Sequence, residues 1–468
     1  MAYDGVTGDR VREEPEAPRA DVDDARLQDA LSHARRSAFY AERVPPAGGR
    51  AWDRLARVPL TRRRDLMSAP PLARLAGPRE ELWQYVESSG TTGTGALATA
   101  YTRDDMARSV TGLTPAFLEL FARGRTVLNR FPYALAAVSS TLEWLAREGG
   151  ACIIPASNLS WLVPFARALD LLRRAAPDVV AALPLEFVIL GRLAEHLGIP
   201  RRDLCAPVDA VIAGGGPLPT ALTRMIEADW GARVVELYGS TETLALGTGC
   251  GAGRLHLATH NFVVEVLDPR TWAPVPAGAP GALTLTSLHL RGMPLVRYVN
   301  EDIAVVDHGP CPCGSALPVA RILGRLGEDI AMGGRTLYPT DILDAAYGFA
   351  AAHGSRILLV IVREASVHVR VEMPAHRSRD DAALASLRDQ LGVAVTVELV
   401  RPGDVLDCDS LLKTPMVYKP TPIVDWRESA RRPYTMLDAL IAFPRYTFAD
   451  LRRLVGRALR NYLGKRRL

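Results

Sequence analysis

Between residues 104 and 237, short apolar segments alternate with amphipathic helical segments, and this alternation most limits the possible folds. Each apolar segment is a few residues long and mostly apolar, as is typical of strands buried on both faces of a sheet. The expected strands are 126–130, 151–154, 178–182, 209–213 and 233–237, and the expected helices are 104–123, 139–148, 163–175, 185–197 and 218–229. The pattern predicts an α/β fold, with helices covering the faces of a parallel sheet.

The pattern then changes twice along the chain. Residues 260–307 lose the helical period and indicate β hairpins, and from about residue 328 a smaller α/β unit begins. Its expected strands lie near 356–363, 367–373 and 394–400. A chain of 468 residues is too long for one ordinary core, so several domains are expected. We predict a disordered lead-in over 1–24, a large domain over 25–325, a small domain over 326–425 and a C-terminal extension over 426–468.

Composition excludes several classes of function. The chain has 56 basic and 52 acidic residues, and a net charge of +4 does not favour nucleic acid as a partner. We expect no transmembrane segment and no signal peptide, because no apolar run is long enough and the N-terminus is polar. Six cysteines in so long a chain are no disulfide framework, which predicts a reducing cytoplasmic location.

Residues 88–95 combine three glycines with five hydroxyl side chains, between two strand-like runs. Glycines allow backbone N–H groups to turn inward, and such a turn forms a nest for anions. No lysine follows and the next element is a strand, so the segment is not a Walker A loop. The alternative is a flexible linker. We favour a polyphosphate cradle, formed by Ser88, Ser89, Gly90, Thr91, Thr92 and Gly93.

Four later segments fit the same interpretation. Gly214, Gly215, Gly216 and Pro217 follow a buried strand, where backbone can approach a flat ring closely. The segment from Tyr238 to Glu242 follows another strand, and ligands of open α/β sheets bind at such strand ends. Asp302 can accept both hydroxyls of a ribose, and Arg325 marks a change of composition. Each segment alone could be an ordinary turn.

Five segments, taken in order, resemble those of the adenylate-forming, AMP-binding enzyme superfamily. They are SSGTTG, GGGPLP, YGSTE, RYxxxD and GRxxxD. Within the superfamily, four segments are similar to those of the phenylacetate–coenzyme A ligase family. They are SAFYAERVP, VPLTRRRDL, VESSGTTGTG followed by YTRDD, and CPCG. The resemblance covers residues 25 to 425. It implies a large domain of parallel α/β sheets with a small β-barrel-like part, followed by a small mobile α+β domain.

The resemblance implies a two-step reaction. A carboxylate attacks the α-phosphorus of ATP and pyrophosphate leaves, and a thiol, usually that of coenzyme A, then captures the acyl-adenylate. Glu242 would bind Mg²⁺, with Thr241 beside it. The other implied nucleotide contacts are Ser88 to Gly93, the glycines 214–216 with Pro217, Tyr238, Gly239, Ser240, Asp302 and Arg325.

A lysine near the end of the small domain is also implied, bridging the acyl carboxylate and the α-phosphate. Lys419 and Lys413 compete for this role, and Lys419 matches the spacing to Asp425 better. The alternative is that both are solvated surface residues. The segment before Lys419 lacks the usual glycine just ahead of the lysine.

Four residues suggest a second, structural metal. Cys250 and His256 lie close in sequence, and Cys311 and Cys313 flank a proline. Three thiolates and one imidazole suit tetrahedral Zn²⁺ with no open position. Some members of the ligase family carry such a set. The alternative is four unrelated buried residues.

The acyl pocket implied by the family includes Phe131, Tyr133, Ser139, Pro184 and Gly214. The two aromatic rings could stack on an aryl or arylacetic acid, or could equally be core. The extension over 426–468 is expected to form a basic amphipathic helix, which could dock on the body or bind an acidic partner such as a carrier protein. A homodimer is possible.

The first functional hypothesis is therefore a carboxylic acid–coenzyme A ligase. The second keeps adenylation but passes the acyl group to a carrier-protein phosphopantetheine or to an amine. The third is a nucleotide-binding sensor without chemistry.

Overall fold

The structure is a computed structural model, and it describes residues 22–88, 96–373, 380–413 and 422–427. Its centre is an eleven-stranded mixed sheet with the order β10-β11-β12-β13-β9-β8-β7-β6-β5-β3-β4. The five strands at one end are parallel, as expected from their continuous apolar character. They are β3 (Thr126–Asn129), β4 (Cys152–Pro155), β5 (Val179–Ala182), β6 (Ala210–Gly214) and β7 (Arg233–Ser240).

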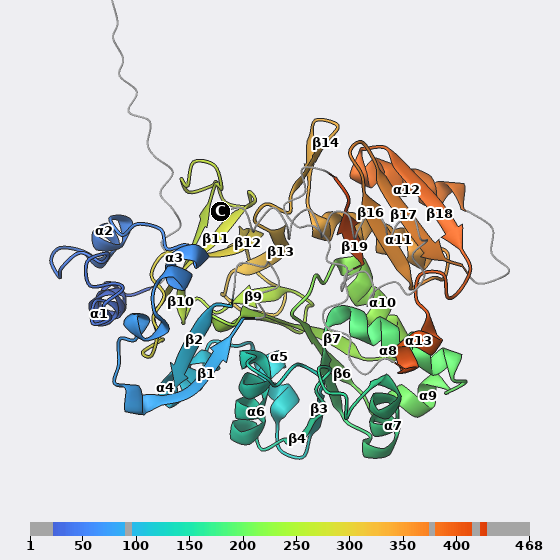
Figure 1. The fold of residues 1–468 in the computed structure, drawn as a ribbon, viewed down its shortest axis with the longest axis horizontal. Coiled ribbons are helices and arrows are strands. Elements are labelled where there is room, and N and C mark those ends of the chain that lie inside the picture. The colour runs from blue at the N-terminus through green and yellow to red at the C-terminus, as the bar shows by residue number, and fades with distance from the viewer. Residues whose placement is uncertain (1–21, 89–95, 374–379, 414–421, 428–468) are drawn as a thin grey trace, which may run out of the picture.

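Helices cover both faces of the parallel half (Figure 1). Because side chains alternate along a strand, Val127 packs into one core cluster and Leu128 into another on the opposite face. The helices are α6 (Ala137–Gly149), α7 (Phe165–Ala175), α8 (Pro184–His196), α9 (Arg201–Cys205) and α10 (Thr220–Trp230). Four of the expected helices are thereby confirmed.

The expected helix over 104–123 is wrong. The structure has α4 (Arg103–Ser109), then α5 (Pro115–Leu118) and a short 3₁₀ turn, η3 (Glu119–Phe121). The break covers residues 110–114, and its last residue, Thr114, has the extended backbone (φ −67°, ψ 145°) that a following proline imposes. Pro115 then opens the new helix, where its missing N–H costs nothing.

The other half of the sheet is antiparallel from β7 onward. Its strands are β8 (Leu244–Gly249), β9 (Leu255–Leu257), β10 (Phe262–Leu267), β11 (Gly281–Ser287), β12 (Tyr298–Asp307) and β13 (Val319–Arg325). The β hairpins expected here are present, but the expected small β-barrel-like part does not form a sheet of its own. These strands continue the main sheet, which is open with β10 and β4 at its two ends.

The first described residues form a layer beside the antiparallel half. Apolar side chains of α1 and α2 pack against Val263, Leu288 and Val296. A two-stranded antiparallel hairpin, β1 with β2, follows. The elements are α1 (Asp24–Ala34), α2 (Ala51–Ala56), α3 (Arg63–Ser68), η1 (Pro71–Arg74), η2 (Arg79–Glu81), β1 (Leu82–Glu87) and β2 (Ala98–Thr102).

The residues after β13 form a second sheet with the order β18-β17-β16-β19. The three strands expected in this region are present, and the unit shares a core cluster with α8 and α10. Its elements are β14 (Ile330–Met332), β15 (Arg335–Leu337), α11 (Pro339–Ala352), β16 (Leu358–Val362), β17 (Val367–Glu372), α12 (Asp381–Leu391), β18 (Val395–Val400), α13 (Cys408–Lys413) and β19 (Ile423–Asp425). None of the helices in the described ranges is long and apolar enough to cross a membrane.

A buried ion pair joins two strand–helix connections of the parallel half. The Arg130 guanidinium donates to Glu186 at 2.5 Å and to the carbonyl oxygens of Ala156 and Val163 at 2.9 and 3.0 Å. Asn158 donates to the other Glu186 oxygen at 3.3 Å. The two charged side chains are only 2% and 3% exposed, so the pair holds these loops together away from water.

We predict that Arg130→Met lowers the free energy of unfolding by about 3–5 kcal/mol, because it leaves the Glu186 charge buried without its cation. The double variant Arg130→Met/Glu186→Leu should recover most of that loss, since no charge then stays buried. Urea denaturation of both variants measures the difference. A double variant no more stable than the single one would contradict this account.

Candidate functional site

The predicted phosphate loop lies between two paired strands. The residue pair Glu87–Ala98 closes the β1–β2 hairpin, and the Ser88 N–H donates to the Leu97 carbonyl at 2.9 Å. The Ser88 hydroxyl also accepts from the Leu97 N–H at 2.9 Å. The strand–loop–strand arrangement is therefore confirmed at both ends. The predicted residues Ser89, Gly90, Thr91, Thr92 and Gly93 lie outside the described residues.

Arg63 supplies a cation beside this loop, and the motifs did not single it out. Its guanidinium donates to Glu242 at 2.7 Å and also to the Ser88 hydroxyl. The two charged side chains are 15% and 5% exposed. The pair joins the predicted magnesium ligand to the start of the loop. The only sequence signal was the segment VPLTRRRDL, whose three successive arginines do not reveal which one faces the site.

Thr61 explains why α3 begins at this point. Its N–H donates to the Arg297 carbonyl, and its carbonyl accepts from the Val299 N–H, both at 2.9 Å. Its hydroxyl donates to the Val296 carbonyl at 2.8 Å. These bonds attach the chain to the start of β12, so the first turn of α3 lies over the site.

Glu242 lies in the tight turn that links β7 to β8. The Ser240 N–H donates to the Thr243 hydroxyl at 3.0 Å, and the Glu242 N–H donates to the Ser240 hydroxyl at 3.3 Å. The Tyr101 hydroxyl, from β2, donates to the Thr241 carbonyl. Thr241 therefore links the turn to the hairpin that carries the phosphate loop.

The glycines of the site are required by close backbone contacts. A Cβ atom on Gly239 would lie 1.9 Å from the Leu244 carbonyl oxygen, and one on Gly214 would lie 2.3 Å from that of Leu237. Gly215 has a φ of +73°, which favours glycine. Pro217 follows in the same loop between β6 and α10. The glycine-rich loop therefore follows β6 as expected, and a Cβ atom on Gly216 would lie 3.5 Å from Pro184 Cδ. The close approach of this backbone to a flat ring stays a prediction.

Tyr238 and Asp302 meet although 64 residues separate them. The Tyr238 hydroxyl donates to the Asp302 Oδ2 at 2.7 Å, and the Asn300 amide donates to the same oxygen at 2.8 Å. Arg325 Nε lies 3.3 Å from the Asp302 Oδ1. Burial raises the pKa of Asp302, and the Arg325 charge and the Tyr238 hydrogen bond oppose that rise. A buried carboxylate with these partners is fixed in place and can accept hydrogen bonds from hydroxyl groups of a ligand.

Glu236 is another residue that sequence reasoning missed. It lies two residues before Tyr238 on β7, so both side chains project from the same face of the strand. Burial raises the pKa of Glu236 to about 7. One acidic residue within the apolar run ARVVELYGS was the available signal.

Three of the predicted acyl-pocket residues meet around Asn129. The Asn129 amide donates to the Ser139 hydroxyl at 3.1 Å and to the Tyr133 hydroxyl at 3.2 Å, and its carbonyl accepts from the Phe131 N–H at 3.0 Å. The Phe131 side chain is 2% exposed and belongs to the core cluster that includes Leu183. Asn129 was not predicted as a site residue, although it lies within the expected strand 126–130 and is the last residue of β3.

The two candidate lysines are not brought to the site by any described contact. Lys413 is the last residue of α13, and Lys419 falls outside the described residues. The choice between them stays a prediction.

The four predicted metal ligands come together at the far end of β8 and β9. The potential ligand atoms of Cys250, His256, Cys311 and Cys313 all lie within 4.8 Å of one another. The Cys250 and Cys311 Sγ atoms are 3.9 Å apart, close to the roughly 3.8 Å expected between two thiolates on a tetrahedral zinc ion. His256 Nδ1 lies 2.7 Å from the Leu317 carbonyl oxygen, which leaves Nε2, 3.3 Å from Cys313 Sγ, available to a metal.

Comparisons with known proteins find similarity in sequence and in overall fold. The sequence profile described as AMP-binding enzyme matches residues 72–290. The phenylacetate–coenzyme A ligase of Thermus thermophilus is 26% identical over 409 residues, which cover 78% of this chain and 90% of the relative. That of Pseudomonas putida is 28% identical over 331 residues, 68% of this chain and 73% of the relative. A crystal structure of a 2-hydroxyisobutyryl-CoA ligase in the postadenylation state superposes with a TM-score of 0.72 at 21% identity, covering 87% of this chain and 89% of that chain.

The buried carboxyl of Glu236 leads to a prediction about pH. Between about pH 4.5 and pH 7 the unfolded chain has lost the Glu236 proton while the folded protein keeps it, so stability falls as pH rises through this window. Glu236→Gln removes this titration. Its free energy of unfolding relative to the wild type should therefore rise by roughly 2 kcal/mol from pH 4.5 to pH 7 and then level off.

Urea denaturation at several pH values measures this difference. Glu148→Gln, an exposed replacement on α6, is the control and should follow the wild type at every pH. Parallel curves for Glu236→Gln and Glu148→Gln would contradict the assignment.

Proposed function

The chain belongs to the AMP-binding, adenylate-forming enzymes, and we propose that it activates an aryl or arylacetic acid with ATP and transfers it to coenzyme A. The observation that carries this proposal is the convergence of Ser88, Arg63 and Glu242 beside the Tyr238–Asp302–Arg325 cluster. One group offers donors and charge for a polyphosphate, and the other offers a buried acceptor for a sugar. Relatives in Thermus thermophilus and Pseudomonas putida are named phenylacetate–coenzyme A ligases, which supports both the acid class and the acceptor.

The reaction has two steps. The substrate carboxylate oxygen attacks the α-phosphorus of ATP, and the bond to the β-phosphate breaks as pyrophosphate leaves. A thiolate of coenzyme A then attacks the acyl carbon, and AMP leaves with the electrons of the acyl–oxygen bond. Negative charge develops on the leaving group in each step, so preorganised donors lower the barrier.

Arg63 and the phosphate loop act on the first leaving group. The guanidinium, held against Ser88, would stabilise the β- and γ-phosphates as pyrophosphate departs. Glu242 offers a carboxylate of the kind that Mg²⁺ prefers, and Arg63 already neutralises it. When bound there, Mg²⁺ would supply further charge stabilisation for the phosphates. Thr241, Ser240 and Gly239 hold the turn that presents Glu242.

The nucleoside would lie along the ends of β6 and β7. Gly214, Gly215, Gly216 and Pro217 form a wall without side chains for the adenine ring, with Tyr238 opposite. Asp302 would accept the ribose hydroxyls, with Arg325 beside it. Glu236, on the same face as Tyr238, could accept a hydrogen bond from the exocyclic amino group of adenine.

The acyl group would lie beside this wall. Asn129 orders Tyr133 and Ser139 in the neighbouring connection, and Pro184 contacts the glycine surface at Gly216. A mostly apolar pocket with a few oriented polar groups is typical for a small aromatic acid. Lys419 is our proposal for the cation that bridges the carboxylate and the α-phosphate, on its spacing to Asp425.

The test is acid-dependent exchange of pyrophosphate into ATP, measured with a panel of aryl and arylacetic acids. Arg63→Ala should lower the exchange rate by about 100-fold, because a donor to the leaving group is lost. Its neighbour Arg64, whose side chain is 87% exposed, is the matched control, and Arg64→Ala should keep the wild-type rate. Lys419→Ala should remove exchange, whereas Lys413→Ala should retain it.

The acceptor is tested separately by mass spectrometry of products. Acyl-coenzyme A should accumulate with the active acid. Exchange without any acylation of coenzyme A, together with acylation of a phosphopantetheinylated carrier or an amine, would overturn the choice of acceptor. Absence of exchange with every acid would overturn the adenylation itself.

We also propose that Cys250, His256, Cys311 and Cys313 bind a structural Zn²⁺. The cluster offers four ligands and no open position, which suits a structural rather than a catalytic ion. It would tie the β8–β9 hairpin to the loop before β13, segments about 60 residues apart.

Elemental analysis of the purified full-length protein should find one zinc per chain. Cys313→Ser should lose most of the zinc and lower the melting temperature, because one of four ligands is removed. Cys152→Ser is the control, since Cys152 is likewise exposed but belongs to no cluster. Less than a trace of zinc in the wild type would refute the site.

A further inference from the structure

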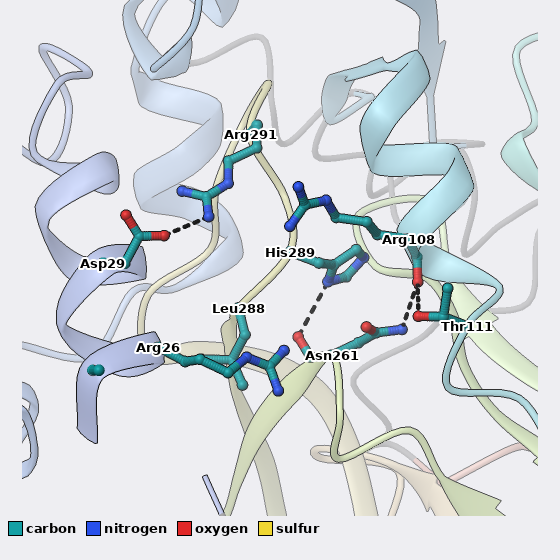
Figure 2. Close-up of a pocket in the computed structure, with 9 residues that line it drawn as sticks. Arg26, Asp29, Arg108, Thr111, Asn261, Leu288, His289 and Arg291 are labelled. Carbon is teal, nitrogen blue, oxygen red and sulfur yellow. Dashed lines mark hydrogen bonds and ion pairs between the residues drawn. The ribbon is translucent and has the colours of Figure 1, made fainter. Parts of the chain in front are cut away.

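A separate pocket of about 440 Å³ lies between α1, the end of α4 and the loop that links β11 to β12 (Figure 2). None of its lining residues belongs to the site described above. Its floor contains the buried side chains of Asn261 and His289, and its rim carries Arg26, Arg108 and Arg291.

The rim is strongly basic. Three guanidinium groups and one carboxylate, that of Asp29, line the pocket, and Asp104, the partner of Arg108, lies outside this lining, so positive charge stays in excess. Arg26 donates to the His260 carbonyl at 2.7 Å, Arg291 pairs with Asp29, and Arg108 pairs with an exposed aspartate one turn away on α4. Each guanidinium has five N–H donors, so these partners leave donors for a ligand.

The floor is held in place by buried hydrogen bonds. The Asn261 amide donates to the carbonyl oxygens of Arg108 and Ser109 at 3.1 and 3.3 Å. The main-chain carbonyl oxygen of Asn261 lies 3.1 Å from His289 Nδ1, so this ring nitrogen carries the proton. The pocket floor therefore joins α4 to the β11–β12 loop in a fixed arrangement.

His289 presents an unused acceptor at the centre of this pocket. Its side chain is 2% exposed, and within the described residues its Nε2 has no hydrogen-bond partner. Burial, reinforced by Arg108, Arg26 and Arg291, lowers the pKa of His289 to about 4, so the ring is neutral at pH 7. Figure 2 shows the ring among the three guanidinium groups. A buried nitrogen with a free lone pair is costly unless a donor reaches it.

We propose that this pocket binds a small phosphorylated compound that also carries a hydroxyl group. A phosphate with nearly two negative charges matches the excess positive charge, and guanidinium groups bind phosphate oxygens in pairs. The hydroxyl donates to His289 Nε2. The volume is in the range for small organic ligands and exceeds what a free phosphate fills. The ligand is neither the acid nor the nucleotide of the proposed reaction.

Calorimetric titration of the full-length protein with ribose 5-phosphate and with inorganic phosphate tests the proposal. Both should bind saturably, and the affinity should be unchanged by saturating MgATP or coenzyme A. In Arg26→Gln/Arg108→Gln the affinity should fall at least about 30-fold, because charge-assisted hydrogen bonds are lost. Arg103→Gln/Arg202→Gln is the matched control, with the same loss of charge at two exposed positions outside the pocket, and should change the affinity less than about two-fold.

Sulfate tests the role of His289, because it has the charge of hydrogen phosphate without the hydroxyl. It should bind more weakly than phosphate, and phosphate should shift one Nε2 resonance of ¹⁵N-histidine-labelled protein that is missing in His289→Gln. Three results would overturn the site. They are failure of both ribose 5-phosphate and phosphate to bind, displacement of either probe by MgATP or coenzyme A, and an affinity in Arg26→Gln/Arg108→Gln equal to that of the wild type. The contact to His289 would be overturned if sulfate bound as tightly as phosphate and phosphate shifted no histidine Nε2 resonance. None of these results depends on whether the protein adenylates an acid.

Discussion

The whole site depends on the change of strand direction at β7. This strand pairs in parallel with β6 on one side and antiparallel with β8 on the other. The parallel half brings the glycine wall to the carboxyl end of the sheet, while the tight turn into β8 presents Glu242 at the same end. Ligands of α/β sheets bind where neighbouring connections diverge, and β7 provides such a point. One strand thereby places Glu236, Tyr238 and Glu242 within a few residues.

This arrangement requires an unusually close approach of backbone segments. Neither Gly214 nor Gly239 leaves room for a Cβ atom, because a carbonyl oxygen of the neighbouring strand occupies that space. Two non-glycine residues with positive φ, Leu244 and Glu301, lie directly beside the predicted ligands. Such conformations cost free energy and persist only where the surrounding structure imposes them, which is common at functional sites. Here Leu244 lies two residues after Glu242, and Glu301 immediately precedes Asp302.

Buried charge is the second cost of the site. Glu242 and Asp302 are both nearly inaccessible, and each is compensated by an arginine, Glu242 by Arg63 from far along the chain and Asp302 by Arg325 from the adjacent strand β13. In the proposed function, the two arginines would serve different ends of a nucleotide. Arg63 belongs to the region that the phosphates would occupy, and Arg325 to that of the sugar. The Asp302–Arg325 pair needs only the neighbouring strands β12 and β13, whereas the Arg63–Glu242 pair needs α3 to pack beside the β7–β8 turn.

The sequence by itself determined the parallel strands, most of the helices and the chemistry of the predicted ligands. Short, mostly apolar strands and glycine-rich turns are local features of the chain, so their spacing and composition can be recognised in the sequence alone. It also predicted that Cys250, His256, Cys311 and Cys313 come together, because these are unusual residues at unusual spacing. It did not reveal Arg63 among three arginines, the Asn129 contacts, the single continuous sheet or the break over residues 110–114. Only the tertiary structure decided those, and the basic pocket around His289, because they depend on burial and on contacts between residues far apart in the chain.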